Sequence, residues 1–135
     1  MKYATLGNTG LLVSKLCFGT MTFGDGRGLF KAISAVGQAG ADELVKTSID
    51  GGINFFDTAD NYTEGESEKI LEQSLKNINI ARKDVVIATK VYSRVGRGGM
   101  TSGLLAATLW TVWRPVSAVC RPTISTCTRS MATIP

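Results

Sequence analysis

Three polar residues stand at the ends of apolar segments, where they could do chemistry together. Asp57 follows the apolar run INFF (53–56), Tyr62 comes five positions later, and Lys90 ends the run VVIATK. An ammonium group at the end of a buried strand must be neutralised by a carboxylate, and Asp57 is the natural partner for Lys90. A positive charge beside a phenol favours ionisation of that phenol, so Tyr62 would become a usable proton donor.

A phenol of this kind suits the reduction of a carbonyl group. Hydride adds to the carbonyl carbon, while Tyr62 protonates the oxygen and relieves the developing alkoxide. No side chain supplies hydride, so a cofactor is expected. In the alternative interpretation, each of the three residues is only a cap or a satisfied residue at a strand end, and residue types alone leave both interpretations open.

The elements that carry these residues have the pattern of strands alternating with helices. Three compact apolar runs have the composition of buried strands: LCFGTM (16–21), INFFDT (53–58) and DVVIATKV (84–91). Their alternation with helical segments predicts a parallel sheet, with the polar residues at the carboxyl ends of its strands. Earlier in the chain, YATL and LLVSKL flank the turn GNTG and predict a β-hairpin.

Two helices are expected between these strands. ADELVKTSID (41–50) begins with acidic residues and ends before a glycine pair, which favours a helix end there. In the second helix, Thr63 and Glu66 have the spacing of a capping box. One face of this helix is expected to be lined by Ile70, Leu71, Ser74, Leu75 and Ile78. The fold class is therefore α/β.

Composition argues against several other classes of protein. The net charge of +4 is uneven: residues 1–100 hold 12 basic and 11 acidic residues (+1), and residues 101–135 hold 3 arginines and no acid (+3). This excess forms no basic stripe, so nucleic acid is not an expected partner. Three cysteines without a CxxC motif predict neither a disulfide framework nor a metal site. The absence of a signal-peptide core and of about 20 consecutive apolar residues predicts a cytoplasmic protein without a membrane span.

Three segments together resemble the aldo-keto reductase superfamily, including its branch near the potassium-channel β-subunits. They are GTMTFG (19–24), GINFFDTADNYTEGESEKILEQSLK (52–76) and DVVIATKV (84–91). The resemblance covers residues 2 to about 95. It implies a (β/α)8 barrel that binds NADP(H) at its carboxyl-end mouth and reduces aldehydes or ketones to alcohols.

The resemblance also implies roles for individual residues. Asp57, Tyr62 and Lys90 match three of the four catalytic positions of the family. The loop beside the nicotinamide is matched by Gly19, Thr20 and Met21, and Asp57 also borders the cofactor. The fourth catalytic position is a histidine, and this chain contains none.

Beyond about residue 96 the resemblance stops, and we hypothesise a shift of reading frame, which would explain why. Regrouped from the third base of each codon, RPTISTCTRSM (121–131) can read TDYIDLYQIH, which is similar to the family strand that ends in the catalytic histidine. In the same frame, residues 107–120 can read HIMDGVEASLRRLQ, an amphipathic helix. We therefore expect residues 1–96 to be the N-terminal part of the barrel, with the hairpin and three barrel strands. Residues 97–135 are expected to be an irregular, non-homologous tail.

A chain truncated in this way is expected to be inactive. The residues that would hold the adenosine phosphate fall in the missing part, so firm binding of NADP(H) by this chain alone is not expected. A small carbonyl compound is the expected substrate of the family enzyme. Two alternatives stay open: a non-catalytic NADP-binding regulatory subunit of the channel β-subunit type, and a small independent domain with a partner of its own.

Overall fold

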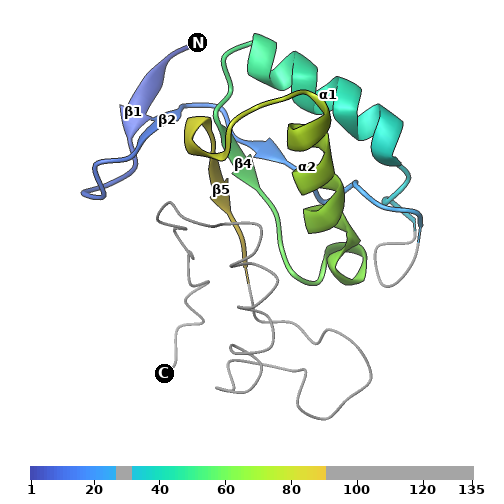
Figure 1. The fold of residues 1–135 in the computed structure, drawn as a ribbon. Coiled ribbons are helices and arrows are strands. Elements are labelled where there is room, and N and C mark those ends of the chain that lie inside the picture. The colour runs from blue at the N-terminus through green and yellow to red at the C-terminus, as the bar shows by residue number, and fades with distance from the viewer. Residues whose placement is uncertain (27–31, 91–135) are drawn as a thin grey trace, which may run out of the picture.

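The fold alternates strands and helices in the order expected from the sequence. The computed structural model of the chain describes residues 1–26 and 32–90 (Figure 1). Its strands and helices are β1 (Tyr3–Thr5), β2 (Leu12–Ser14), β3 (Phe18–Gly19), α1 (Gln38–Asp50), β4 (Phe55–Asp57), α2 (Glu66–Asn77) and β5 (Val86–Ala88). The expected tail at residues 97–135 lies outside the described residues.

The predicted parallel sheet is confirmed. Strands β3, β4 and β5 lie in that order and pair in parallel, so that Phe18, Phe56 and Ile87 form one row across the sheet. Strand β3 is shorter than the predicted run because the chain turns directly after Gly19. The Thr20 amide still donates to the Asp57 carbonyl at 2.9 Å, and the Phe23 amide then closes a turn onto the Thr20 carbonyl at 2.9 Å.

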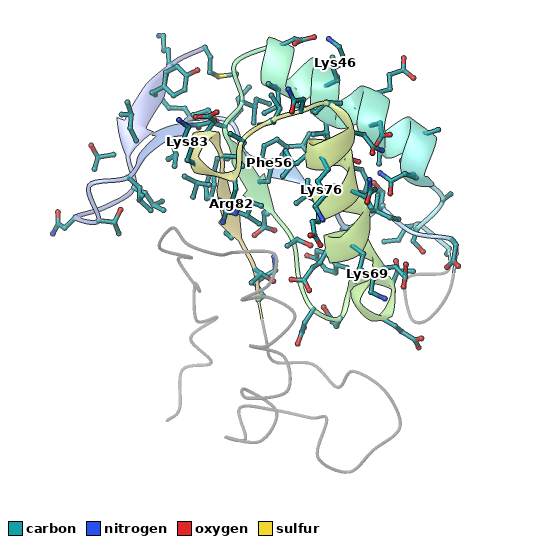
Figure 2. The ribbon with its side chains drawn as sticks, in the orientation of Figure 1. Lys46, Phe56, Lys69, Lys76, Arg82 and Lys83 are labelled. Carbon is teal, nitrogen blue, oxygen red and sulfur yellow. The ribbon has the colours of Figure 1, made fainter. Side chains whose placement is uncertain are left out.

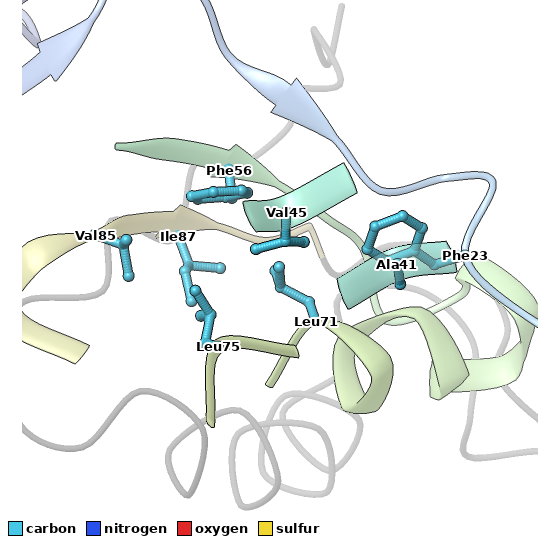
Figure 3. Close-up of a cluster of buried hydrophobic side chains, with 8 residues drawn as sticks. All are labelled: Phe23, Ala41, Val45, Phe56, Leu71, Leu75, Val85 and Ile87. Carbon is cyan, nitrogen blue, oxygen red and sulfur yellow. The ribbon is translucent and has the colours of Figure 1, made fainter. Parts of the chain in front are cut away.

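Both helices cover the same face of this sheet (Figure 1). Between the helices and the sheet lies one cluster of buried apolar side chains (Figure 3), made up of Phe23, Ala41, Val45, Phe56, Leu71, Leu75, Val85 and Ile87. The predicted apolar face of α2 is confirmed: Leu71, Ser74 and Leu75 are buried, and Ile70 and Ile78 pack against the cluster. The outer faces of the helices carry Lys46, Lys69 and Lys76 (Figure 2), each paired with a nearby carboxylate.

Helix α1 begins three residues earlier than the sequence predicts, so its first turn contains no acidic residue. The reason is a contact with α2. The Gln38 side chain donates to Asp42 Oδ1 at 2.6 Å within α1, and across to Ser74 Oγ at 2.9 Å and the Ile70 carbonyl at 3.2 Å in α2. This contact between helices orders the extra turn, which local sequence preference does not favour.

The predicted capping box at the start of the second helix is wrong. Helix α2 begins at Glu66, its N-cap is Gly65 with φ of 89°, and no side chain caps it. Thr63 instead adopts a left-handed backbone with φ of 47° and donates its hydroxyl to the Phe23 carbonyl at 3.1 Å. The local pattern predicts that the Thr63 hydroxyl caps the helix, but a tertiary contact with Phe23 occupies this hydroxyl instead.

The predicted hairpin is present and is tied to the amino end of β4. Strands β1 and β2 pair antiparallel, with Ala4 opposite Val13. The Asn54 side chain accepts from the Ser14 amide at 2.7 Å and donates to the Leu12 carbonyl at 3.0 Å. The hairpin therefore lies at the end of the parallel sheet that is opposite the carboxyl ends of β3, β4 and β5. Within the part of the chain described, no helix is both long and apolar enough to span a membrane.

Candidate active site

The strand register decides which way Asp57 points. Phe56 and Ile87 lie in the buried cluster beneath the helices, and Phe18 packs against this cluster. Successive side chains of a strand point to opposite faces, so the next row points away from the helices. That row consists of Gly19, Asp57 and Ala88, and Lys90 follows Ala88 by two residues. Asp57 and Lys90 therefore share the face opposite α1 and α2.

The predicted ion pair between Asp57 and Lys90 is present. Lys90 Nζ lies 2.6 Å from Asp57 Oδ2 and donates a second hydrogen bond of 2.7 Å to the Thr58 carbonyl. The side chains keep 32% and 39% of their exposure, for Lys90 and Asp57 respectively, so water screens the pair and its net contribution to stability is small. The contacts fix where the ammonium stands.

Tyr62 lies beside this ammonium group. Lys90 Nζ is 5.1 Å from the centroid of the Tyr62 ring, within the range of a cation–π contact. The Asp60 amide donates to the Lys90 carbonyl at 3.1 Å, and the Tyr62 amide donates to the Ala59 carbonyl at 3.2 Å. The loop after β4 is thus tied to the end of β5. The structure brings together all three residues that the sequence singles out for catalysis.

The residues expected beside a nicotinamide divide into two groups. Gly19 is exposed, with open space where a Cβ would stand, and Met21 is 40% exposed. Together with Asp57 they form a partly exposed border at the carboxyl ends of β3 and β4. Thr20 is fully buried, and its hydroxyl is engaged with Ser67 Oγ at 2.8 Å and the Asp57 carbonyl at 3.2 Å. The Thr20 amide and carbonyl are hydrogen-bonded as well, to the Asp57 carbonyl, the Phe23 amide and the Ser67 hydroxyl. A contact between Thr20 and a cofactor therefore stays a prediction.

The sequence does not predict a buried group of hydroxyls that lies beside the carboxyl ends of β3 and β4. Ser67, in the first turn of α2, donates to the Thr20 carbonyl at 2.7 Å and lies 3.4 Å from the Thr58 hydroxyl. The group joins the loop after β3, the end of β4 and the start of α2. Each of these residues directly follows a strand end or a helix start, and that position is the only sequence signal that could have indicated the group.

Cys17 lies on the sheet face that carries Asp57. The thiol is free, and partial burial raises its pKa. The Asp57 carboxylate raises the Cys17 pKa further, whereas the Lys90 ammonium lowers it. Both charges of the ion pair therefore affect the Cys17 pKa. Cys17, which directly precedes β3, lies beside the candidate site. No group of three side chains able to hold a metal ion occurs in the described ranges 1–26 and 32–90.

A second carboxylate close to the rim, Asp60, is buried and only partly satisfied. Its side chain faces Glu68 of α2, and Thr89 donates to Glu68 Oε1 at 2.7 Å. Within the described residues, Asp60 Oδ2 has no hydrogen-bond partner. Burial, and then the Glu68 carboxylate, raise the pKa of Asp60 from its usual 3.8 to about 6. Burial likewise raises the pKa of Glu68.

Replacing Asp60 with asparagine is therefore expected to stabilise the fold at neutral pH. The folded-state pKa of Asp60 is raised, so its favourable contribution is complete below the unfolded pKa of 3.8 and is lost as pH rises through about 6. Asp60→Asn removes the charge and should raise the free energy of unfolding near pH 7 by about 1–3 kcal/mol. Urea unfolding at a series of pH values measures this.

The matched control is Asp50→Asn, which removes an exposed carboxylate of α1 whose ion pair with Lys46 is solvent-screened. It should leave the pH dependence between about pH 4 and pH 6 unchanged. An Asp60→Asn chain that keeps the wild-type pH profile in this window would show that Asp60 ionises normally in the folded state.

Comparison with known proteins identifies the class to which this fold and site belong. Residues 15–109 match the family model described as the Aldo/keto reductase family. The chain therefore belongs to the aldo/keto reductase family, and its three parallel strands are the first part of the (β/α)8 barrel of that family.

Particular relatives include both enzymes and channel subunits. The chain is 42% identical over 93 residues to the aldo-keto reductase AMT2 of Alternaria alternata, covering 69% of this chain and 24% of that protein. It is 35% identical over 105 residues to a probable voltage-gated potassium channel subunit beta of Oryza sativa, covering 77% of this chain and 29% of the relative. The chain thus spans about a quarter of the length of these relatives.

Solved structures agree with this assignment. The holo form of aldo-keto reductase AKR11C1 from Bacillus halodurans superposes with a TM-score of 0.71 at 27% identity, covering 93% of this chain and 38% of that one. A putative aldo-keto reductase from Pseudomonas aeruginosa, PA4992, gives a TM-score of 0.67 at 30% identity, with coverage of 87% and 42%.

Proposed function

We propose that this chain is the N-terminal part of an NADP(H)-dependent reductase that converts aldehydes or ketones to alcohols. The observation that carries the proposal is the position of Lys90 Nζ, which contacts Asp57 Oδ2 at 2.6 Å and lies 5.1 Å from the centroid of the Tyr62 ring. A structural ion pair alone does not require a phenol beside it. Carbonyl reduction does require an acid there.

Each of the three side chains has its own task in this proposal. Tyr62 donates a proton to the carbonyl oxygen as negative charge develops on it. Lys90 places a positive charge beside the Tyr62 ring. Asp57 fixes Lys90 by accepting its hydrogen bond, so the ammonium stays near the ring.

The described residues fit the nicotinamide end of the cofactor. Gly19, Met21 and Asp57 are each at least partly exposed at the carboxyl ends of β3 and β4. When bound there, NADPH supplies the hydride that no side chain can provide. The residues for the adenosine phosphate would come from later parts of the barrel, so we propose that this chain alone binds NADP(H) weakly or not at all.

We further propose that the chain as encoded is inactive, because a one-nucleotide loss near codons 96–100 replaced the rest of the barrel. Residues 97–135 would then be a non-homologous tail. This is supported by the regrouped codons of residues 107–131 and by the absence of histidine from the sequence. A cytoplasmic setting is part of the same proposal, since an odd number of cysteines without a paired motif suits a reducing compartment.

Restoring the reading frame tests both parts of the proposal. One nucleotide is inserted near codon 98 of the gene, and the product is compared with the 135-residue chain for NADPH oxidation in the presence of small aldehydes and ketones. We expect carbonyl-dependent turnover from the restored protein and none from the 135-residue chain. Turnover by the 135-residue chain would contradict the proposed inactivity, whereas a restored protein that neither binds nor oxidises NADPH would contradict the reductase assignment.

A non-catalytic NADP-binding regulatory subunit is the second candidate. It is favoured by the similarity to probable channel β-subunits of Oryza sativa and Arabidopsis thaliana, at 35% and 37% identity. The same restored protein separates the candidates. NADPH binding, seen as quenching of protein fluorescence, without turnover of any carbonyl compound would favour the regulatory subunit.

A further inference from the structure

The two residues that follow Tyr62 adopt an unusual backbone. Thr63 has φ of 47° and ψ of 42°, Glu64 has φ of 57° and ψ of 36°, and Gly65 continues the turn with φ of 89°. The left-handed region is uncommon for any residue with a Cβ, and for a β-branched residue such as threonine it is a clear outlier. A backbone of this kind persists only where surrounding contacts enforce it, and it is enriched at functional sites.

The contacts that enforce it come from the loop after β3. The Thr63 side chain is 1% exposed, and its hydroxyl donates to the Phe23 carbonyl at 3.1 Å. It also presses against Gly24 so closely that a Cβ at that position would stand 2.4 Å from Thr63 Oγ1. Only glycine permits this approach, so Phe23 and Gly24 form a seat fitted to the threonine side chain.

The contact of Thr63 with Phe23 and Gly24 fixes the chain on the carboxyl-terminal side of Tyr62. On the amino-terminal side, the Asp60 amide is bonded to the Lys90 carbonyl at 3.1 Å. On the carboxyl-terminal side, Tyr62 is followed directly by the seated Thr63. The phenol therefore projects from a short segment fixed at both ends: to the Lys90 backbone just beyond β5, and to the loop that borders the proposed nicotinamide site.

We propose that Thr63 is a positioning residue, which holds the Tyr62 ring beside Lys90 by combining a left-handed turn with its hydrogen bond to Phe23. The inference rests on the proposed function, in which Tyr62 is the proton donor. Glycine would adopt the left-handed turn more easily than threonine, but it has no side chain to seat against Gly24. A residue chosen only for the shape of the turn would not be buried and hydrogen-bonded in this way.

The test measures the proximity of Lys90 to Tyr62 in the 135-residue chain, with no need for catalysis. The chain is labelled with fluorotyrosine, and its Tyr62 resonance is assigned in the fluorine NMR spectrum by Tyr62→Phe. Because the ammonium lies near the ring, Lys90→Met should shift this resonance. The size of that shift is then compared among wild type, Thr63→Ser, Thr63→Val and Thr63→Gly.

The variants separate the hydroxyl from the shape of the side chain. Thr63→Ser keeps the donor to Phe23 and is expected to keep most of the Lys90-dependent shift. Thr63→Val keeps the branched shape but leaves the Phe23 carbonyl without its donor, and Thr63→Gly removes the seated side chain altogether. Both should lose most of the shift. If either folded variant, as judged by its amide spectrum, keeps the full shift, Thr63 does not position Tyr62, and should Thr63→Val fail to fold, Thr63→Gly decides.

Failure of this inference can be told from failure of the proposed function. In the frame-restored protein, Thr63→Val should lower kcat by about tenfold to a hundredfold with KM nearly unchanged, and Thr63→Ser should recover most of it. A restored protein without turnover whose Lys90-dependent shift still requires Thr63 would overturn only the reductase assignment. If Thr63→Val changes neither the turnover nor the Lys90-dependent shift of the Tyr62 resonance, only the role of Thr63 is overturned.

Discussion

Tyr62→Phe in the frame-restored protein is expected to lower kcat by roughly a hundredfold to ten-thousandfold, the usual contribution of a positioned general acid. Phenylalanine keeps the ring that lies 5.1 Å from Lys90 Nζ, so the local packing should survive. Only the hydroxyl that protonates the carbonyl oxygen is removed. Because this proton is transferred in the transition state, kcat and kcat/KM should fall together. Steady-state kinetics with one aldehyde at saturating NADPH measure the effect.

The chain offers a matched control for this experiment. Tyr3→Phe removes the same atom from a phenol that donates to the Gly52 carbonyl at 2.8 Å, at the opposite end of the sheet. It should leave kcat within about twofold of the wild-type value, as expected for a surface change far from the chemistry. Equal losses from the two variants would mean that the loss at Tyr62 reflects folding rather than proton donation.

Phe56→Ala is expected to destabilise the fold by about 3–5 kcal/mol, the usual cost of removing a fully buried aromatic side chain. Phe56 (Figure 3) is 0% exposed and stands in the central strand β4. Its ring centroid lies 5.9 Å from that of Phe18. Loss of the ring leaves a cavity between the sheet and the two helices. The shift of the urea midpoint, followed by far-ultraviolet circular dichroism, measures the change in stability.

Leu44→Ala is the control for this large-to-small substitution, because Leu44 is 41% exposed on α1. Its effect should stay within about 0.5 kcal/mol. Similar midpoints for Phe56→Ala and Leu44→Ala would show that the buried cluster does not carry the stability of this chain.

The alternation of strands and helices could be read from the sequence because it depends on short-range patterns. Continuous apolar runs at 53–58 and 84–91 indicate buried strands, and the parallel pairing of β4 with β5 follows from the helix between them. The ion pair of Asp57 with Lys90 was predictable for the same reason. Both residues end neighbouring strands, and a buried ammonium needs a carboxylate.

The starts of the two helices were not predictable, because contacts between distant segments set them. Helix α1 includes Gln38 because the Gln38 side chain bonds to Ser74, 36 residues away. The Thr63 hydroxyl does not cap α2 because it bonds to the Phe23 carbonyl, 40 residues away. Asp60 also gave no local signal. Its burial and its proximity to Glu68 depend on how α2 packs beside the end of β5.

The sequence by itself determined the order of the elements, the family and the residue types at the strand ends, because each depends on periodicity or on neighbours along the chain. Only the tertiary structure decided that Asp57 and Lys90 share the face opposite α1 and α2 with the Tyr62 ring beside them, and that the chain makes a left-handed turn at Thr63. The physical reason is that a side chain's direction after a strand end is fixed by the surfaces it meets. Here those surfaces belong to loops separated by 40 residues of chain.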